Sequence, residues 1–359
     1  MRRGCSVGIL ALLVSAGCGD STAPATVVDL AAPWTRATPA EAGIDSAMLA
    51  QAVSVGAAAS RCRSLLVVRH GRLVLEQYFG GADSTTRFDV RSVTKSVVSS
   101  LVGIAIARGT LSGLSATVGS YLGPPDTLDA GDQAVTVRQL LTMTSGYSWN
   151  ETTGGDYNLW ILSPDHVQFL LDRSQTNTGS FTYNSAAVHL LGVIVQHATA
   201  RPLPAFADTT LFQPIGITSA QWEALENGTV NGGSGIALTG RDLLRYGQLV
   251  LQRGRSGSRQ VVPQEWVAAM TTPQFGWRET DGPQHGVSYG YLWWTADGPP
   301  VAATFAWGYG GQFIYVVPSL DLVVVATTAW QGMTQGVQSQ AVTDSTWSVI
   351  VDGVIPAVH

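Results

Sequence analysis

The sequence is poor in charged residues, has few cysteines and contains a single lysine. Only 13% of its 359 residues are charged, and the formal net charge is −5. The basic residues form no run, so the composition gives no indication of a nucleic-acid partner. Hydrophobic residues make up 45% of the chain. That share excludes a disordered or fibrous protein and suffices for a sizeable core. All other cations are arginine, so the one lysine, Lys95, needs an explanation.

The three cysteines cannot form an intramolecular disulfide framework. Cys5 lies inside an N-terminal targeting segment and Cys18 lies at its end, which leaves Cys62 alone in the folded part. The surrounding stretch, SRCRSLLVVRHG, has the pattern of the lead-in to a strand. This favours a packed or idle thiol over a nucleophile at Cys62.

The N-terminus has the pattern of an export signal. The positive start MRR is followed by an apolar run from Val7 to Gly17, which is too short to span a bilayer as a permanent anchor. The small residues of SAGC directly precede Cys18, as in a bacterial lipoprotein signal. We expect a signal peptide over residues 1–17, a lipid on Cys18 and a location in the cell envelope. Ser15 stands where such signals usually carry Leu or Val, so secretion without a lipid is the alternative.

Strand patterns occur at both ends of the chain and helical patterns occur between them. Residues 18–43 form a spacer rich in Pro, Ala and Thr, and residues 64–79 predict a β-hairpin around a His-Gly turn. Further strand patterns lie at 289–294, 304–318 and 321–330, and a final helix is expected from about 342 to 354. This order predicts one α/β (α+β) domain over 44–359. Its antiparallel sheet comes from both chain ends and is flanked by helices, with a mostly helical insertion at about 110–285.

The lone lysine lies at the start of a helix that is apolar on nearly every face and stops near Arg108-Gly109. Ser92 and Lys95 are three residues apart, so their side chains share one face of that helix. A serine hydroxyl needs an adjacent base to act as a nucleophile. Arginine cannot serve because it keeps its proton, whereas the lysine pKa of about 10.4 falls when the ammonium group is desolvated. The pair predicts a Ser92 nucleophile with Lys95 as its base.

The S-V-T-K motif, with its flanks FDVRSVTKSVVSSLVGIAIARG and VTVRQLLTMTSGY, resembles the serine β-lactamase and penicillin-binding-protein superfamily. The similarity is to the class C branch, which also holds esterases, D-amino-acid peptidases and 6-aminohexanoate-dimer hydrolases. It extends from about Pro39 to the C-terminus. It implies a β-lactamase/transpeptidase-like fold and an acyl-enzyme on Ser92, with no cofactor and no metal.

A second family element is a tyrosine in a Y-x-N motif. FTYNSAAVHLLG places Tyr183 correctly before an apolar helix, but the third residue is Ser185. The resemblance implies that Tyr183 transfers protons between Ser92, Lys95 and the leaving group; a buried aromatic is the alternative. Ser185 is a candidate substrate-binding residue, and helix N-capping is its alternative role.

The third family element is K-T-G or H-x-G on a strand that lines the site. AWGYGGQFIYVVP resembles it at Tyr309, Gly310 and Gly311, which are candidate substrate-binding residues. The resemblance implies an oxyanion hole made by the backbone N–H groups of Ser92 and Gln312. A glycine bulge that only shapes the strand is the alternative. Since no second lysine can bind a substrate carboxylate, neutral esters or amides are favoured, and whether an arginine substitutes is open.

Other patterns have simpler explanations. In MTSGY, Met143 stands where the family carries histidine, and we expect a structural role. GVSYG, at Gly286 to Gly290, matches the sequence motif of a nucleophile elbow, but the motif must lie between a strand and a helix, and an aromatic strand pattern follows it here. His189 and His197 lie eight positions apart on one expected helix, so packed or exposed side chains are favoured over metal ligands. Four aromatic residues could line an acyl pocket, although core packing is expected for most of them: Trp160, Tyr291, Trp293 and Trp294.

The sequence therefore predicts an exported serine hydrolase that cleaves a small-molecule ester, amide or peptide through Ser92. Its partners include no nucleic acid, and it meets the membrane only through the lipid anchor. The alternatives are a penicillin-binding protein or D-Ala-D-Ala carboxypeptidase, a β-lactamase, and a non-enzymatic β-lactam sensor or binding protein. Retention of Ser92, Lys95 and Tyr183 argues against the last of these.

Overall fold

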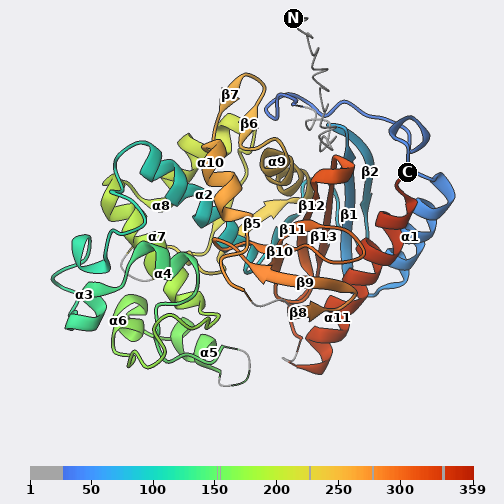
Figure 1. Ribbon diagram of the computed structural model, residues 1–359. Coiled ribbons are helices and arrows are strands. Elements are labelled where there is room, and N and C mark those ends of the chain that lie inside the picture. The colour runs from blue at the N-terminus through green and yellow to red at the C-terminus, as the bar shows by residue number, and fades with distance from the viewer. Residues whose placement is uncertain (1–26, 152, 154, 226–227, 277–278, 334–335) are drawn as a thin grey trace, which may run out of the picture.

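A computed structural model describes residues 27–359 except 152, 154, 226–227, 277–278 and 334–335 (Figure 1). Within these residues the chain forms a central antiparallel sheet in the order β2-β1-β13-β12-β11-β10-β9-β8. The first two strands come from the start of the domain and the others from its end, which confirms the predicted sheet. The strands are β1 (Cys62–Arg69), β2 (Arg72–Tyr78), β8 (Glu279–Asp281), β9 (Gln284–Tyr289), β10 (Trp294–Ala296), β11 (Ala303–Gly308), β12 (Gln312–Val317) and β13 (Leu322–Thr328).

The sheet separates two hydrophobic cores because side chains alternate along each strand. On β13, Val323 and Val325 face one core, while Leu322, Val324 and Ala326 face the other. Helices α1 (Ser46–Ala58) and α11 (Val337–Trp347), with the helical segment 348–354, cover the second core. Helices α9 (Gly240–Leu251) and α2 (Val93–Ala107) cover the first. The predicted hairpin, the buried helix α2 and its end near Arg108 are confirmed.

The region between α2 and β8 is mostly helical, as predicted, and lies on one side of the sheet in Figure 1. Two small antiparallel sheets accompany the helices, one of three strands and one of two. Besides α9, the α-helices of this region are α3 (Ala130–Ala134), α4 (Val137–Leu141), α5 (Asp156–Ile161), α6 (His166–Leu171), α7 (Ser185–Thr199), α8 (Leu203–Ala207) and α10 (Gln264–Met270). The short strands are β3 (Arg87–Asp89), β4 (Gln221–Trp222), β5 (Ile236–Thr239), β6 (Arg255–Ser256) and β7 (Arg259–Gln260).

Three boundaries differ from the predictions. The pattern at 289–294 is mainly the connection between β9 and β10 rather than a strand. The final helix begins earlier than predicted, at Val337. Its first turns lack the apolar pattern of the later ones, so no sequence pattern indicated them. The predicted spacer packs on the domain from residue 28 onward, where Leu30 is buried and Val28 N–H donates to Gln252 Oε1 at 2.9 Å. The predicted signal peptide and Cys18 lie outside the described residues.

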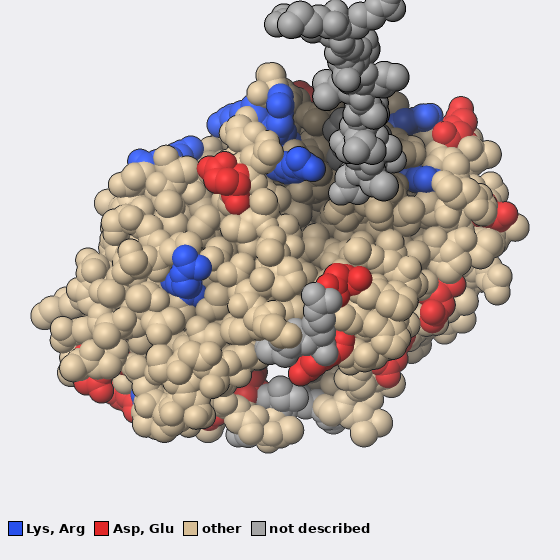
Figure 2. Space-filling model, in the orientation of Figure 1, with Lys and Arg blue, Asp and Glu red and all other residues tan. Residues whose placement is uncertain are grey.

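Charge is sparse on the folded domain. Figure 2 shows one face of the molecule, on which most of the surface is uncharged and neither sign covers a large area. None of the helices in the described part of the chain is long and apolar enough to cross a membrane.

Candidate active site

Ser92 and Lys95 meet at the N-terminus of α2, as the sequence predicts. Lys95 Nζ lies 2.8 Å from Ser92 Oγ. Helical geometry produces this contact because residues three apart lie on one face. Ser92 precedes the first helical residue, and its backbone N–H makes no hydrogen bond with the described residues. The nucleophile candidate therefore carries both an adjacent amine and a free amide donor.

The Lys95 amine is enclosed by three oxygen atoms. Besides Ser92 Oγ, it contacts Ser185 Oγ at 2.7 Å and the Gly233 carbonyl oxygen at 2.7 Å. The side chain is buried, with 1% of its surface exposed. Burial lowers the pKa of Lys95 to about 8, the charge of Glu151 raises it and the charge of Arg91 lowers it. A lysine with this pKa is partly neutral near physiological pH and can accept a proton.

Tyr183 lies beside this pair. The Lys95 amine is 4.9 Å from the centre of the Tyr183 ring, and the ring stacks on Trp294 with centroids 6.1 Å apart. Burial raises the pKa of the Tyr183 phenol well above its usual range; the charge of Glu151 raises it further, while Ser92 and Arg91 lower it. The phenol therefore keeps its proton in the free protein.

Met143 has the structural role expected of it, since it fixes the loop that carries Tyr183. Its carbonyl oxygen accepts the Thr182 N–H at 2.8 Å, and its sulfur accepts the Asn184 N–H at 3.4 Å. The side chain is buried. Both contacts flank Tyr183, so Met143 helps to set the position of the phenol.

Ser185 points into the site rather than capping its helix. The N-cap of α7 is Asn184, whose side chain accepts the Ala187 N–H at 2.9 Å, so the N-cap alternative for Ser185 is wrong. Ser185 is the first helical residue, and its hydroxyl bridges Lys95 and Glu151.

Glu151 is a site residue that the sequence analysis missed. Its carboxylate accepts the Ser185 hydroxyl at 2.6 Å, the Ser185 N–H at 2.7 Å and the Trp149 indole N–H at 3.0 Å. A polar chain thus runs from Glu151 through Ser185 and Lys95 to Ser92. Glu151 lies in a loop 34 positions before Ser185, and no motif in that loop marks it.

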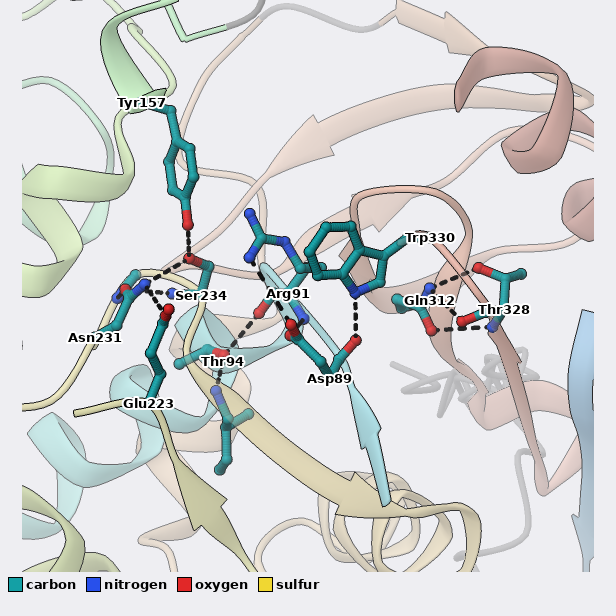
Figure 3. A network of polar contacts seen from close by, with 12 residues as sticks. Asp89, Arg91, Thr94, Tyr157, Glu223, Asn231, Ser234, Gln312, Thr328 and Trp330 are labelled. Atoms are coloured by element: carbon teal, nitrogen blue, oxygen red, sulfur yellow. Dashed lines mark hydrogen bonds and ion pairs between the residues drawn. The ribbon is translucent and has the colours of Figure 1, made fainter. Parts of the chain in front are cut away.

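Gly233 was also missed, and a compact loop holds its carbonyl against Lys95. Asn231 Oδ1 accepts the N–H groups of Gly233 and Ser234 at 3.1 and 3.0 Å, and Asn231 Nδ2 donates to Glu223 at 2.7 Å (Figure 3). The small sheet that pairs β3 with β5 joins this loop to the strand before Ser92.

The segment 309–311 directly follows the end of β11, and it is a turn and not part of a strand. It joins β11 to β12, and Gly310 and Gly311 have φ of 74° and 88°, which explains the two glycines. The predictions of one continuous strand and of a glycine bulge are therefore wrong. A Cβ atom on Gly308 would lie 2.2 Å from the Val90 carbonyl oxygen, so the end of β11 packs directly on the backbone that leads to Ser92.

Gln312 has a structural side chain. It is the first residue of β12 and is fully buried. Its side-chain Nε2 donates to Thr328 Oγ1 at 2.6 Å, and its Oε1 accepts the Thr328 N–H at 3.1 Å (Figure 3). In the turn, the Gly311 N–H donates to the Gly308 carbonyl oxygen at 3.2 Å, whereas the N–H groups of Tyr309 and Gly310 make no hydrogen bond with the described residues.

Most of the remaining candidates belong to the core. Trp160, Tyr291 and Trp293 are buried, and the Trp294 ring stacks on that of Tyr183. The GVSYG serine, Ser288, lies within β9 and cannot form a nucleophile elbow. No cluster of three potential metal ligands occurs among the described residues.

Cys62 is buried at the start of β1, and burial raises the pKa of its thiol to about 11. A protonated, buried thiol fits the packed or idle cysteine that the sequence predicts.

Three groups therefore meet at one point: the Ser92 hydroxyl, the buried Lys95 amine with its lowered pKa, and the protonated Tyr183 phenol. Together they can carry out nucleophilic acyl transfer. A family model described as beta-lactamase matches residues 46–344, which include all of these groups. The chain belongs to the beta-lactamase family. The resemblance in the S-V-T-K region is thereby confirmed over most of the domain.

Relatives of this beta-lactamase-family hydrolase are named for different substrates. The 6-aminohexanoate-dimer hydrolase of Paenarthrobacter ureafaciens is 25% identical over 74% of this chain and 72% of its own length. Esterase EstB of Burkholderia gladioli is 28% identical over 75% of this chain and 86% of its own. The structure of EstCE1, a hydrolase with promiscuous acyltransferase activity, superposes with a TM-score of 0.66 at 18% identity, covering 86% of this chain and 98% of that one. That likeness concerns the fold.

Proposed function

We propose that the protein hydrolyses carboxylic esters or amides through a covalent acyl-enzyme on Ser92. The observation that carries this proposal is the 2.8 Å contact between Ser92 Oγ and a fully buried lysine amine whose pKa is lowered to about 8. The names of the two sequence relatives, an esterase and an amide hydrolase, support the same substrate class.

In acylation, Ser92 Oγ attacks the substrate carbonyl and its proton passes to Lys95. The C–O or C–N bond of the substrate breaks, and the leaving group takes the proton of Tyr183. In deacylation, the Tyr183 phenolate accepts a proton from water, and the resulting hydroxide attacks the acyl carbon. Ser92 Oγ leaves with the proton of Lys95, which restores both groups. In this scheme Lys95 is the base and Tyr183 the acid of acylation, and the two groups exchange these roles in deacylation.

The Ser92 N–H is one proposed oxyanion donor, and the second belongs to the turn after β11. The sequence analysis assigned it to Gln312. The free N–H of Tyr309 and the contact of the preceding Gly308 with Val90 support Tyr309 instead. Preorganised amide donors of this kind are usually a large part of the catalytic effect.

Intact mass spectrometry after exposure to a fluorophosphonate tests the proposal. The wild type should gain one phosphonyl adduct, and Ser92→Ala should gain none. Penicillin exposure and nitrocefin hydrolysis, run in parallel, separate an esterase or amidase from a penicillin-binding protein or β-lactamase. A wild type that forms no adduct would overturn the enzyme proposal and favour a binding protein.

The pH dependence of hydrolysis should report Lys95. Because the amine must be neutral to accept the Ser92 proton, kcat/KM for a neutral ester should rise with pH, with a midpoint near the Lys95 pKa of about 8. The charge of Glu151 raises this pKa, so Glu151→Gln should move the midpoint to lower pH. Asp132→Asn, which alters a buried carboxylate bonded to Tyr147, should leave it unchanged. An unmoved or higher midpoint in Glu151→Gln would contradict the assignment.

We also propose that the protein is exported and lipidated at Cys18. The support is the pattern of the first 18 residues alone. Recovery of the protein in the membrane fraction of the producing bacterium, with a fatty-acid mass on its N-terminal peptide, tests this proposal.

A further inference from the structure

Arg91, the residue before the nucleophile, has an unusual backbone, and its guanidinium makes no hydrogen bond with the described residues. Its φ of 51° lies in the left-handed region, which is unfavourable for a residue with a side chain. Its N–H donates to Asp89 Oδ1 at 3.1 Å, and its carbonyl oxygen accepts the Thr94 N–H at 3.0 Å and the Thr94 hydroxyl at 2.6 Å. These bonds fix the direction in which the side chain leaves the backbone.

The guanidinium group lies between two aromatic rings. Figure 3 shows Arg91 with Tyr157 on one side and Trp330 on the other. The guanidinium carbon is 4.4 Å from the centre of the Trp330 ring and 5.1 Å from that of the Tyr157 ring. Both rings are anchored: the Trp330 indole donates to the Asp89 carbonyl at 3.2 Å, and the Tyr157 hydroxyl lies 2.8 Å from Ser234 Oγ. The loop after β13 and the helix α5 thus hold the cation in one place.

The hydrogen-bonding capacity of this guanidinium is unused. It makes no hydrogen bond to any described residue, although it can donate five, and its Nε is buried without a partner. The nearest carboxylate, Asp89, is 3.9 Å away, and the Arg91 side chain is only 15% exposed.

Two other arginines, Arg69 and Arg241, show how a structural guanidinium is hydrogen-bonded in this protein. Arg69 donates to four backbone carbonyl oxygens, those of Ala42, Gly43, Leu320 and His359. Arg241 makes a bidentate contact with Glu76 at 2.6 and 3.0 Å. A structural arginine is normally paired in this way, so the free donors of Arg91 point to a ligand.

The cation also acts on the catalytic groups. Burial is the main cause of the lowered pKa of Lys95, and the positive charge of Arg91 lowers it further. Arg91 likewise lowers the pKa of Tyr183 against the larger effect of burial. Geometry also places the guanidinium next to the site: it lies against Tyr157, whose hydroxyl contacts Ser234, the neighbour of the Gly233 whose carbonyl oxygen contacts Lys95.

We propose that Arg91 is a specificity-determining residue that binds a carboxylate of the substrate, held between Tyr157 and Trp330. A guanidinium offers parallel N–H donors that match the two oxygens of a carboxylate. The protein would then favour esters or amides that carry a free carboxylate on the acyl part or the leaving group. Arg91 is thus the arginine that supplies the cation missing from the 309–311 turn. The inference rests on the proposed function.

Two matched ester pairs test it. The first is the 4-nitrophenyl half-ester of adipic acid and its methyl ester, which differ by a carboxylate on the acyl part. The second is 4-carboxyphenyl butyrate and its methyl ester, which differ by a carboxylate on the leaving group. Wild-type kcat/KM should favour the carboxylate member of at least one pair. Arg91→Gln should lower kcat/KM for that member about 10- to 100-fold, mostly through KM, and change its neutral partner by less than about threefold. Assays on the pH plateau remove the effect of Arg91 on Lys95.

Arg87→Gln is the matched control, since Arg87 lies four residues earlier, is exposed and donates to the Ser219 carbonyl at 2.6 Å. It should leave the preference intact, and Arg91→Lys should retain part of it. An equal loss for both members of a pair in Arg91→Gln, or no wild-type preference in either pair, would overturn the role of Arg91.

Inhibition of the wild type keeps the inference testable if Arg91→Gln does not fold. Hexanoate should compete better than hexanamide, with an advantage that falls as salt rises. Equal inhibition by the two compounds overturns the inference. If the wild type hydrolyses none of the esters, the proposed function has failed. In that case, calorimetry on the wild type compares the binding of hexanoate with that of hexanamide. Tighter binding of hexanoate supports the role of Arg91, and equal binding overturns it.

Discussion

Replacing Lys95 by arginine is expected to abolish nearly all activity, with kcat/KM for a neutral ester falling about 10²- to 10⁴-fold. Arginine keeps the positive charge and much of the length, but it does not release its proton and cannot accept that of Ser92. Fluorophosphonate labelling of Ser92, followed by intact mass against time, should slow by a similar factor. The variant thus separates the need for a base from the need for a cation.

A second variant tests whether the loss of activity comes only from altered packing. The Lys95 side chain is buried against Ser185 and Gly233, so the larger guanidinium could disturb packing. Lys95→Gln is smaller and neutral, and it should be equally inactive while its thermal unfolding stays cooperative. If both variants fold and label at the wild-type rate, Lys95 is not the base and the mechanism proposed above fails.

The central pair could be predicted because its geometry is local. Ser92 and Lys95 lie on one helix, so the sequence spacing alone brings their side chains together. The scarcity of lysine made the pair visible. Likewise, the hairpin at 64–79 carries its own local pattern, and so does the mostly helical insertion before residue 285, which is why these two features were predicted correctly.

The rest of the site depends on contacts between distant segments. Glu151, Ser185 and Gly233 converge on Lys95 from a loop, a helix start and a second loop, and no local pattern records that convergence. The N-cap alternative for Ser185 failed because Asn184, its neighbour, is an equally good cap.

The 309–311 turn was predicted as strand because both flanking segments are rich in β-branched and aromatic residues. Only the pair Gly310 and Gly311 marks the reversal, and a glycine pair is also compatible with a bulge. Arg91 had one local signal, its place next to the nucleophile. That it lies between the rings of Tyr157 and Trp330 could not be read from sequence, because those residues come from segments 66 and 239 positions later in the chain.

Replacing Tyr183 by phenylalanine should cost most for substrates with poor leaving groups. The phenol holds its proton because burial raises its pKa, so its proposed part in acylation is to protonate the departing atom. For a 4-nitrophenyl ester, whose leaving group departs as a stable anion, the loss in kcat/KM should be about tenfold or less. For the 4-methoxyphenyl ester or the anilide of the same acid, it should reach about 10²- to 10⁴-fold. The phenylalanine ring keeps the contacts with Lys95 and Trp294, so packing changes little.

The control is Tyr289→Phe, which removes the hydroxyl of a buried tyrosine whose ring lies 6.4 Å from that of Tyr183. It should lower kcat/KM for all of these substrates by the same small factor. A steeper dependence of log kcat/KM on leaving-group pKa in Tyr183→Phe alone assigns the acid to Tyr183. Equal losses across the leaving groups would instead mean that Tyr183 orients Ser92 and Lys95, and that water supplies the proton.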